Sequence, residues 1–229
     1  MAVYENGTRK KFLQKEKVLV GDLKVLFKKF PIEYCIISSV KKTNPKYLTY
    51  LRKRAKTYFL NSNLPLPIEN KYGTPKTLGN DRLAAVVGAH SEFPNKNNLV
   101  IDLGTCVKFD FIDKSGVYHG GNIAPGVNMR LEAMHHFTAA LPSIKKKKVK
   151  SLLGNSTSEA MNNGAVLGVA LEIESFIRRL KKEKGSINVI LTGGDAAFFG
   201  EIVKSKIFVD SYILLTGLNK ILEHQKDIY

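Results

Sequence analysis

Short apolar runs alternate with amphipathic stretches along most of the chain. The runs are rich in β-branched residues, which predicts buried strands, while the stretches between them have the apolar spacing of helices. The pattern predicts strands at 32–40, 57–60, 98–103, 187–191 and 207–209, and helices after Pro45, from about Asn80, at 196–203 and at 212–224. Alternation of strands with helices is typical of the α/β class.

The longest predicted helix spans residues 157–182, with Ser156 or Thr157 as its cap. A stripe of small residues repeats every four positions along it, and these are Ala160, Gly164 and Gly168. Because a glycine inside a helix costs about 1 kcal/mol relative to alanine, the stripe predicts close approach of another backbone. That backbone could belong to this chain or to the same helix in a dimer.

The chain contains a faint internal repeat of a strand, a turn and a strand. In the second half, the strand at 107–112, the turn at 113–116 and the strand at 117–119 follow an earlier strand and loop at 100–105. In the first half, strands at 2–4 and 9–13 flank a turn at 5–7, and nothing precedes them. We therefore expect two related halves, 1–98 and 99–229, of which the first lacks its opening strand.

Composition indicates a globular protein with a substantial core. The chain has 229 residues, of which 44% are hydrophobic, and it has no apolar run long enough to span a membrane. The first eleven residues are too polar for a signal peptide, so we expect a cytoplasmic protein. Cys35 and Cys106 each lie in an apolar stretch without a nearby Cys or His, which favours buried reduced thiols over a disulfide or a zinc site.

The net charge is strongly positive. Thirty-six Lys and Arg residues against 20 Asp and Glu residues give a formal charge of +16, which favours anionic partners such as nucleotides, acidic metabolites or nucleic acid. The densest basic run, at 145–150, contains no aromatic residue or glycine and is typical of a solvated loop. We therefore do not expect nucleic acid binding.

Two predicted strands end in motifs that suit a phosphate or a nucleotide. The first runs into Asp102-Leu-Gly-Thr105, where a carboxylate and a hydroxyl flank Gly104 and a phosphate can approach the backbone. The second runs into Thr192-Gly-Gly-Asp195, where Gly193 and Gly194 allow a tight turn against a ring or a phosphate. Each motif has a plain structural alternative, which is a simple turn for the first and a strand-to-helix connection capped by Asp195 for the second.

Two further segments are candidates for ligand binding. The glycine-rich segment 120–126 could press against a ligand or could simply start a helix, with Pro125 at the first helical position. The segment that begins at Tyr72 leads to Gly79-Asn-Asp-Arg82, which places a base beside a guanidinium able to grip a carboxylate. The alternative for this second segment is that Asp81 caps its helix and Arg82 is solvated.

Taken together and in this order, these segments resemble the type III pantothenate kinases, members of the superfamily of actin, sugar kinases and heat-shock chaperones. The resemblance rests on the ordered set of motifs and is strong over about the last two thirds of the chain. The matching positions are Tyr72 with Pro75, Gly79 to Arg82, Asp102 to Thr105, Gly120 and Gly121 with Pro125 and Gly126, Thr138 before Leu141 and Pro142, Thr157, and Thr192 to Asp195.

The resemblance implies a role for each matching residue. Asp81 would be the general base that takes the proton from the pantothenate hydroxyl, and Asp102 would bind an activating monovalent cation, K⁺ or NH₄⁺. Thr157 would reach pantothenate bound in the partner subunit, so the site would be complete only in a homodimer. The pantothenate pocket would be lined by Tyr72, Gly79, Asn80 and Arg82, and ATP would lie against Gly104, Thr105, Gly193 and Gly194.

The resemblance also implies a segment ahead of Met1. Family members begin with a strand ending in Asp-x-Gly-Asn-Thr/Ser, whose loop grips the ATP phosphates and helps to place Mg²⁺, and this chain starts just beyond it. Because Ala2-Val-Tyr4 resumes the pattern without a break, we favour a start codon assigned too late over a truncated chain or a loss of catalysis. We expect impaired ATP affinity in the chain as given.

These inferences combine into one expectation. The protein should be an α/β protein of two ribonuclease H-like halves of the actin-like ATPase superfamily, with ATP and pantothenate meeting in the central cleft. Its expected activity is ATP-dependent phosphorylation of pantothenate, the first step of coenzyme A synthesis. The alternatives are a catalytically lapsed relative that acts as a regulator or transcriptional activator, and a related kinase for another acid. The intact segment 79–82 favours the enzyme.

Overall fold

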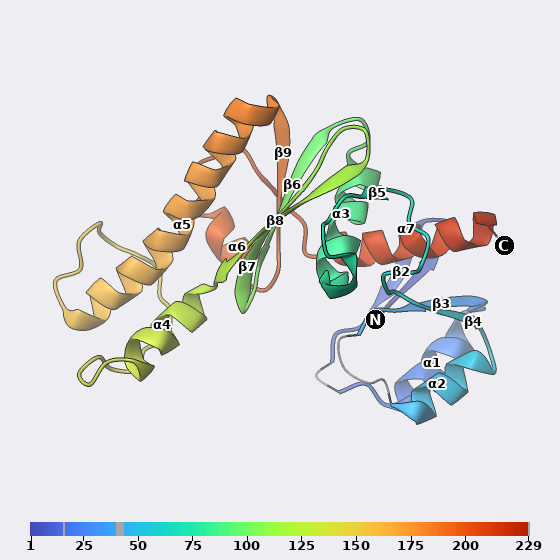
Figure 1. Cartoon of the computed structure of the whole chain (residues 1–229). Helices are drawn as coiled ribbons and strands as arrows, with labels where there is room; N and C mark the ends of the chain where they lie inside the picture. The colour runs from blue at the N-terminus through green and yellow to red at the C-terminus, as the bar shows by residue number, and fades with distance from the viewer. Residues whose placement is uncertain (16, 40–43, 229) are drawn as a thin grey trace. The chain divides into compact units, whose positions relative to one another are not determined.

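A computed structural model describes residues 1–15, 17–39 and 44–228, which form two compact units (Figure 1). Unit 1 comprises Met1–Glu92 together with the segment from Ile213 onward, and unit 2 comprises Phe93–Tyr212. The expected halves, 1–98 and 99–229, differ from this grouping mainly in the closing helix, which is grouped with unit 1. The halves themselves remain a prediction about common ancestry and fold.

Unit 1 contains two pairs of strands. Strands β1 (Ala2–Glu5) and β2 (Thr8–Phe12) are antiparallel, and they are joined by a turn in which Asn6 and Gly7 both have positive φ, as an Asn-Gly hairpin requires. Strands β3 (Tyr34–Ile37) and β4 (Lys56–Phe59) are parallel. These strands confirm the predicted ones within one to three residues at their ends; Val40, in the predicted strand 32–40, lies outside the described residues.

The helices of unit 1 include one that the sequence pattern did not predict. This is α1, at Val20–Lys29, which buries Leu23 and Leu26. The others are α2 (Pro45–Arg52), α3 (Asn80–Glu92) and α7 (Ile213–Ile228), with a short strand β5 (Glu69–Asn70) and a 3₁₀ turn η1 (Pro75–Thr77) ahead of α3. None of the helices among the described residues is long and apolar enough to cross a membrane.

Helices α3 and α7 cross at a pair of glycines. A Cβ atom on Gly88 would lie 2.1 Å from the carbonyl oxygen of Ile213, and one on Gly217 would lie 1.7 Å from that of Ala84. Such distances exclude any side chain, so the two backbones are in direct contact at this crossing. The contact fixes α3, whose first turn carries the candidate catalytic residues, against the closing helix of the chain.

Unit 2 is built on five strands, in the order β10-β9-β6-β7-β8. Strands β6, β7 and β8 form an antiparallel meander, while β9 runs parallel to both β6 and β10. Their bounds are β6 Asn97–Leu103, β7 Cys106–Ile112, β8 Val117–Pro125, β9 Ile187–Thr192 and β10 Phe208–Val209. The strands predicted at 98–103, 107–112 and 187–191 are thereby confirmed.

One face of this sheet packs on three helices (Figure 1). These are α4 (Val127–His136), α5 (Thr157–Lys184) and α6 (Ala196–Gly200). The core combines alternate strand residues such as Ile101 and Phe109 with Val166 and Ile173 of α5 and Phe199 of α6. Alternation places the intervening residues on the opposite face, and this decides which side chains of β6 and β7 lie together.

The predicted long helix begins as expected, but its glycine stripe does not make the intrachain contact that the sequence allowed. Ser156 caps α5 by accepting a hydrogen bond of 3.3 Å from the backbone N–H of Glu159. A Cβ atom on Gly164 would meet nothing within 4 Å among the described residues, and one on Gly168 would meet the guanidinium of Arg130 at 3.3 Å. No backbone of the described chain therefore explains the two glycines.

Of the two alternatives left open for the segment 120–126, the one in which Pro125 starts a helix is wrong. Pro125 is the last residue of β8, whose pairing with β7 extends to Cys106, and α4 begins two residues later at Val127. Pairing with β7 explains the glycines as well, since a Cβ atom on Gly121 would lie 1.6 Å from the carbonyl oxygen of Phe109. The glycine-rich segment is therefore a strand pressed against its neighbour, and β8 is longer than the predicted 117–119.

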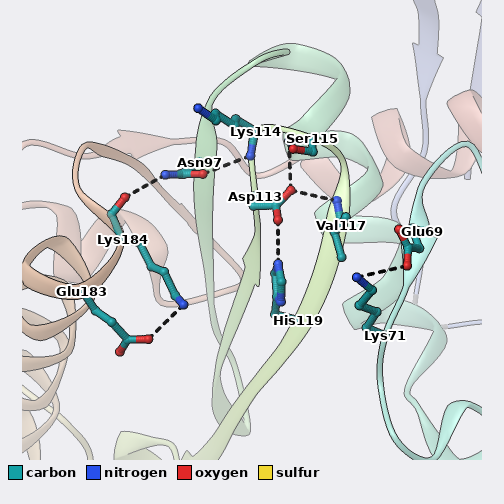
Figure 2. Close-up of polar contacts among 10 residues, drawn as sticks. All are labelled: Glu69, Lys71, Asn97, Asp113, Lys114, Ser115, Val117, His119, Glu183 and Lys184. Carbon is teal, nitrogen blue, oxygen red and sulfur yellow. Dashed lines mark hydrogen bonds and ion pairs between the residues drawn. The ribbon is translucent and has the colours of Figure 1, made fainter.

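The turn predicted at 113–116 joins β7 to β8 and is organised by the carboxylate of Asp113 (Figure 2). Its Oδ1 accepts the backbone N–H groups of Ser115 at 2.9 Å and Val117 at 3.1 Å, and its Oδ2 lies 2.6 Å from Nε2 of His119. The side-chain oxygen of Asn97 accepts the N–H of Lys114 at 3.0 Å beside it. The turn lies at the opposite end of β7 from the motif at 102–105, so these bonds organise a part of unit 2 that is separate from that motif.

Candidate functional site

In unit 1, the start of α3 gathers the residues expected to handle the acid substrate. Gly79 immediately precedes the helix, and a Cβ atom on it would lie 2.5 Å from Oδ1 of Asp81, so the carboxylate folds back over the glycine. The same oxygen accepts the backbone N–H of Arg82 at 2.9 Å. Asn80 donates from its side chain to the carbonyl of Leu60 at 2.8 Å, which ties the helix start to the end of β4.

Arg82 is buried, with 5% of its surface exposed. Its guanidinium lies 5.3 Å from the centre of the Tyr72 ring and donates a long hydrogen bond of 3.4 Å to the Tyr72 hydroxyl. The alternative in which Arg82 is a solvated surface residue is therefore wrong, because tertiary packing withdraws it from water. Burying a guanidinium is costly unless it has partners, so an Arg at this depth is typical of anion recognition or of a structural pair.

In unit 2, the loop after β6 is held by close backbone packing. The N–H of Gly104 donates to the carbonyl of Cys106 at 3.1 Å, and the N–H of Gly126 donates to the carbonyl of Thr105 at 3.0 Å. A Cβ atom on Gly126 would lie 2.3 Å from the Gly104 carbonyl oxygen, so the start of α4 presses directly on this loop. Thr105 itself is exposed, which leaves its side chain at the surface of the unit.

The structure brings the two glycine motifs of unit 2 together. Gly193 has φ of +90°, and a Cβ atom on it would lie 2.4 Å from Oδ1 of Asp102 and 2.5 Å from the carbonyl oxygen of Leu103. The N–H of Asp195 donates to that same carbonyl at 2.9 Å. A Cβ atom on Gly194, in contrast, would meet nothing within 4 Å in the part of the chain that the structure describes. The parallel pairing of β6 with β9 explains the meeting, because the carboxyl ends of both strands lie at one edge of the sheet.

Asp195 lies at the cap position of α6, but its side chain makes no capping hydrogen bond. Its carboxylate is ion-paired instead with the ammonium of Lys146, which also lies 5.3 Å from the centre of the Phe198 ring. Beside it, Asn162 holds the backbone of Lys147 through two hydrogen bonds, of 2.8 Å and 3.2 Å. The basic run at 145–150 is a loop with mostly exposed lysines, as its composition predicted, but Lys146 and the backbone of Lys147 anchor it to the start of α6 and to α5.

Asp102 has a partner that sequence reasoning missed. Nζ of Lys108 lies 2.6 Å from Oδ2 of Asp102. The signal was present in the sequence, because a hairpin whose strands meet at Leu103 and Val107 pairs Asp102 with Lys108. The last expected site residue, Thr157, is the exposed first residue of α5, just after the Ser156 cap.

Comparison with known proteins identifies the family of this chain. The sequence profile of the type III pantothenate kinases matches residues 5–179. The chain belongs to the type III pantothenate kinase family. A type III pantothenate kinase from Bacteroides fragilis is 41% identical over 206 residues, which cover 90% of this chain and 85% of that relative. One from Cytophaga hutchinsonii is 44% identical over 191 residues, covering 83% of this chain and 80% of the relative.

Solved structures confirm the fold of this family member. A Campylobacter jejuni protein, assigned in its description to the Baf family of transcriptional activators, superimposes with a TM-score of 0.59 at 20% identity over 89% of both chains. At this identity the likeness speaks for the fold alone. It agrees with the predicted α/β class, which the strands and helices of unit 2 show directly.

Proposed function

We propose that this type III pantothenate kinase family member transfers the γ-phosphoryl group of ATP to the hydroxyl of pantothenate, the first step of coenzyme A synthesis. Family membership supports the proposal, and the observation that carries it is the buried Arg82, whose guanidinium lies over the Tyr72 ring and whose backbone N–H donates to the carboxylate of Asp81. Pantothenate offers both a carboxylate and a hydroxyl. A guanidinium and a carboxylate on adjacent residues supply one group for each.

In the proposed mechanism, the residues of unit 1 bind pantothenate and take its proton. Arg82, with Tyr72, Gly79 and Asn80, would orient the acid, and Asp81 would accept the proton of the attacking hydroxyl. Gly79 permits this position of the carboxylate, because a Cβ atom there would lie 2.5 Å from Oδ1 of Asp81. Little covalent work is required of the protein, since phosphoryl transfer depends mainly on positioning and on neutralising phosphate charge.

The residues of unit 2 would hold ATP. Thr105 and Gly104 would contact the phosphates, while Gly193 and Gly194 would lie by the adenosine. The packing of Gly193 on the end of β6 supports this assignment, because it brings both motifs to one edge of one sheet. A divalent cation bound with ATP would neutralise part of the phosphate charge.

We further propose that the active form is a cytoplasmic homodimer in which Thr157 completes the partner's pantothenate site. The face of α5 supports an intermolecular contact: Gly164 meets no other part of the described chain, and Leu171, two turns further on, is 66% exposed. Small residues in a helix stripe allow two backbones to approach closely. Sedimentation of the purified protein as a monomer at micromolar concentration would contradict the dimer.

The decisive experiment replaces Asp81 by Asn and measures formation of 4′-phosphopantothenate. Loss of the base should lower kcat by roughly 10²–10⁴-fold with a small change in KM. Asp22→Asn is the matched control, because Asp22 also lies in the first turn of a helix of unit 1, where it accepts the N–H of Leu19 at 2.8 Å. Equal turnover in the wild type and Asp81→Asn would remove Asp81 from the mechanism.

The alternative is a relative that has lost catalysis and acts as a regulator or transcriptional activator. The formal charge of +16 favours it, because a positive charge favours binding to nucleic acid. Buried Arg82 beside Tyr72 and Asp81 weighs against it, because a regulator has no chemical need for an acid-binding group next to a base. Tight DNA binding at physiological salt, with no phosphorylation of pantothenate, would favour the regulator. Turnover of a different acid in competition with pantothenate would instead indicate a related kinase.

A further inference from the structure

Asp102 is the residue expected to bind a monovalent cation, but its carboxylate is already ion-paired with the side chain of Lys108. Nζ of Lys108 lies 2.6 Å from Oδ2 of Asp102, and the two side chains are 17% and 23% exposed. A K⁺ ion that approached Asp102 would meet a carboxylate whose charge is already balanced and an ammonium that repels it. The residues present therefore do not fit a free monovalent ion at Asp102.

The register of the sheet makes Asp102 and Lys108 neighbours. Asp102 on β6 and Lys108 on β7 are direct partners in the antiparallel ladder, so their side chains leave the same face of the sheet as close neighbours. The same row continues to Thr192 on β9 and to Ile123 on β8. The side chains of Lys108 and Asp102 are only 17% and 23% exposed, which sets this pair apart from a fully exposed surface ion pair.

The pair also lies at the proposed nucleotide-binding edge of unit 2. Lys108 lies 2.6 Å from Oδ2 of Asp102. The other carboxylate oxygen, Oδ1, faces Gly193, where a Cβ atom would lie 2.4 Å away. It also faces Gly104, where a Cβ atom would lie 3.8 Å away. One carboxylate thus joins the Lys108 ammonium to both glycine turns that would contact ATP.

We propose that the Lys108 ammonium takes the place of the monovalent cation at Asp102, so that the enzyme works without added K⁺ or NH₄⁺. The inference rests on the proposed kinase function. A lysine ammonium is a compact monovalent charge with three donors, and it supplies locally what a bound NH₄⁺ ion would supply. Because it is tethered, its occupancy does not depend on the ionic composition of the medium.

The first test compares kinase rates in KCl with rates in choline chloride at equal ionic strength. Wild-type enzyme should have the same rate in both salts. Lys108→Met keeps most of the length of the side chain but removes the charge. Its rate in choline chloride should fall by roughly 10–100-fold, the factor of one charge-assisted hydrogen bond, and recover in K⁺ or NH₄⁺. Lys148→Met is the matched control, since Lys148 pairs with Glu201 at 2.6 Å on an exposed surface. A wild-type enzyme that depends on K⁺ as strongly as Lys108→Met would overturn the proposal.

The second test measures binding without turnover, by ²⁰⁵Tl NMR with Tl⁺ as the K⁺ probe. Lys108→Met should bind Tl⁺ and release it when K⁺ is added, while the wild type and Lys148→Met should not bind it. Tl⁺ binding to the wild type that disappears in Asp102→Asn would overturn the proposal. If no salt supports phosphorylation of pantothenate, the kinase function fails and Tl⁺ binding still decides the role of Lys108. If Lys108→Met does not fold, the wild-type measurements decide it alone.

Discussion

Lys146 and Asp195 form an ion pair that ties the basic run at 145–150 to the glycine loop after β9. The two side chains are 24% and 17% exposed, so water screens the pair less than a fully exposed one. The backbone of Asp195 is held separately, by the carbonyl of Leu103. Two independent attachments therefore fix the orientation of the loop that contains Gly193 and Gly194.

Replacing Lys146 by Met should loosen this loop. The free energy of unfolding should fall by about 1 kcal/mol, because Asp195 loses a partly buried charged partner. The KM for ATP should rise by roughly three- to tenfold, while kcat changes less, since the loop is assigned to binding and not to proton transfer. Urea unfolding and steady-state kinetics measure the two effects.

The control for this prediction is Lys148→Met. Lys148 lies in the same basic run and pairs with Glu201, but the two side chains are 75% and 64% exposed. Its loss should change stability by less than about 0.5 kcal/mol, the usual range for an exposed pair, and should leave the KM for ATP unaltered. Equal effects of the two substitutions would mean that the basic run acts through its overall charge and not through the Lys146 contact.

Replacing Asp113 by Asn should weaken the β7–β8 turn in a pH-dependent way (Figure 2). Burial raises the pKa of Asp113, but the hydrogen bonds from His119, Val117 and Ser115 outweigh it and hold the pKa below its usual value of 3.8. A carboxyl with a lowered folded-state pKa stabilises the fold above pH 3.8, and this stabilisation is lost as pH falls through the folded-state pKa. The variant should therefore be less stable than the wild type near neutral pH, by about 0.5–1.5 kcal/mol, and the two should converge in acid.

Urea unfolding over a range of pH from neutral to acid measures this difference. Glu183→Gln is the matched control, because Glu183 pairs with the adjacent Lys184 at 2.9 Å and is 68% exposed. Its removal should leave the pH profile of the wild type unchanged. A constant stability gap between Asp113→Asn and the wild type across the whole range would show that the charge of Asp113 does not stabilise the turn.

Periodicity and turn chemistry predicted most elements of the fold, because these signals are local. The strand at Ile187–Thr192, the Ser156 cap and the hairpin turn at Asn6 and Gly7 are each encoded within a few neighbouring residues. Helix α1 was missed although Leu23 and Leu26 have helical spacing. Pro125 was misread because its place in β8 depends on pairing with β7, which lies outside its local sequence.

The contacts that shape the candidate site could not be predicted, because they depend on partners distant in the chain. The crossing of Gly88 with Gly217 joins segments whose separation in sequence gives no local pattern. The partner of Lys146 is 49 residues away, and any of several lysines in the run could have reached Asp195. The Asp102–Lys108 pair could have been predicted in part, since it follows from the strand register once the hairpin is known. Motif order identified the family, while the charge balance at Asp102 required the structure.

Gly193 and Gly194 should respond very differently to the same substitution. Alanine at Gly193 must adopt a φ of +90°, and its Cβ atom would lie 2.4 Å from Oδ1 of Asp102 and 2.5 Å from the carbonyl oxygen of Leu103. The backbone strain costs about 1–2 kcal/mol, and overpacking against fixed backbone adds about 1–3 kcal/mol. We expect Gly193→Ala to lower the free energy of unfolding by about 2–4 kcal/mol, within the sum of these two ranges.

Gly194→Ala is its internal control, because a Cβ atom there meets nothing within 4 Å among the described residues and the backbone of Gly194 is not in the left-handed region. It should change stability by less than about 0.5 kcal/mol. If Gly194 lies against adenosine as proposed, the added methyl group should instead raise the KM for ATP, because it occupies space that the ligand needs. Measuring unfolding and ATP kinetics on both variants therefore separates a glycine required by the fold from one required by the ligand. Equal losses of stability in the two variants would contradict the packing of Gly193 on Asp102.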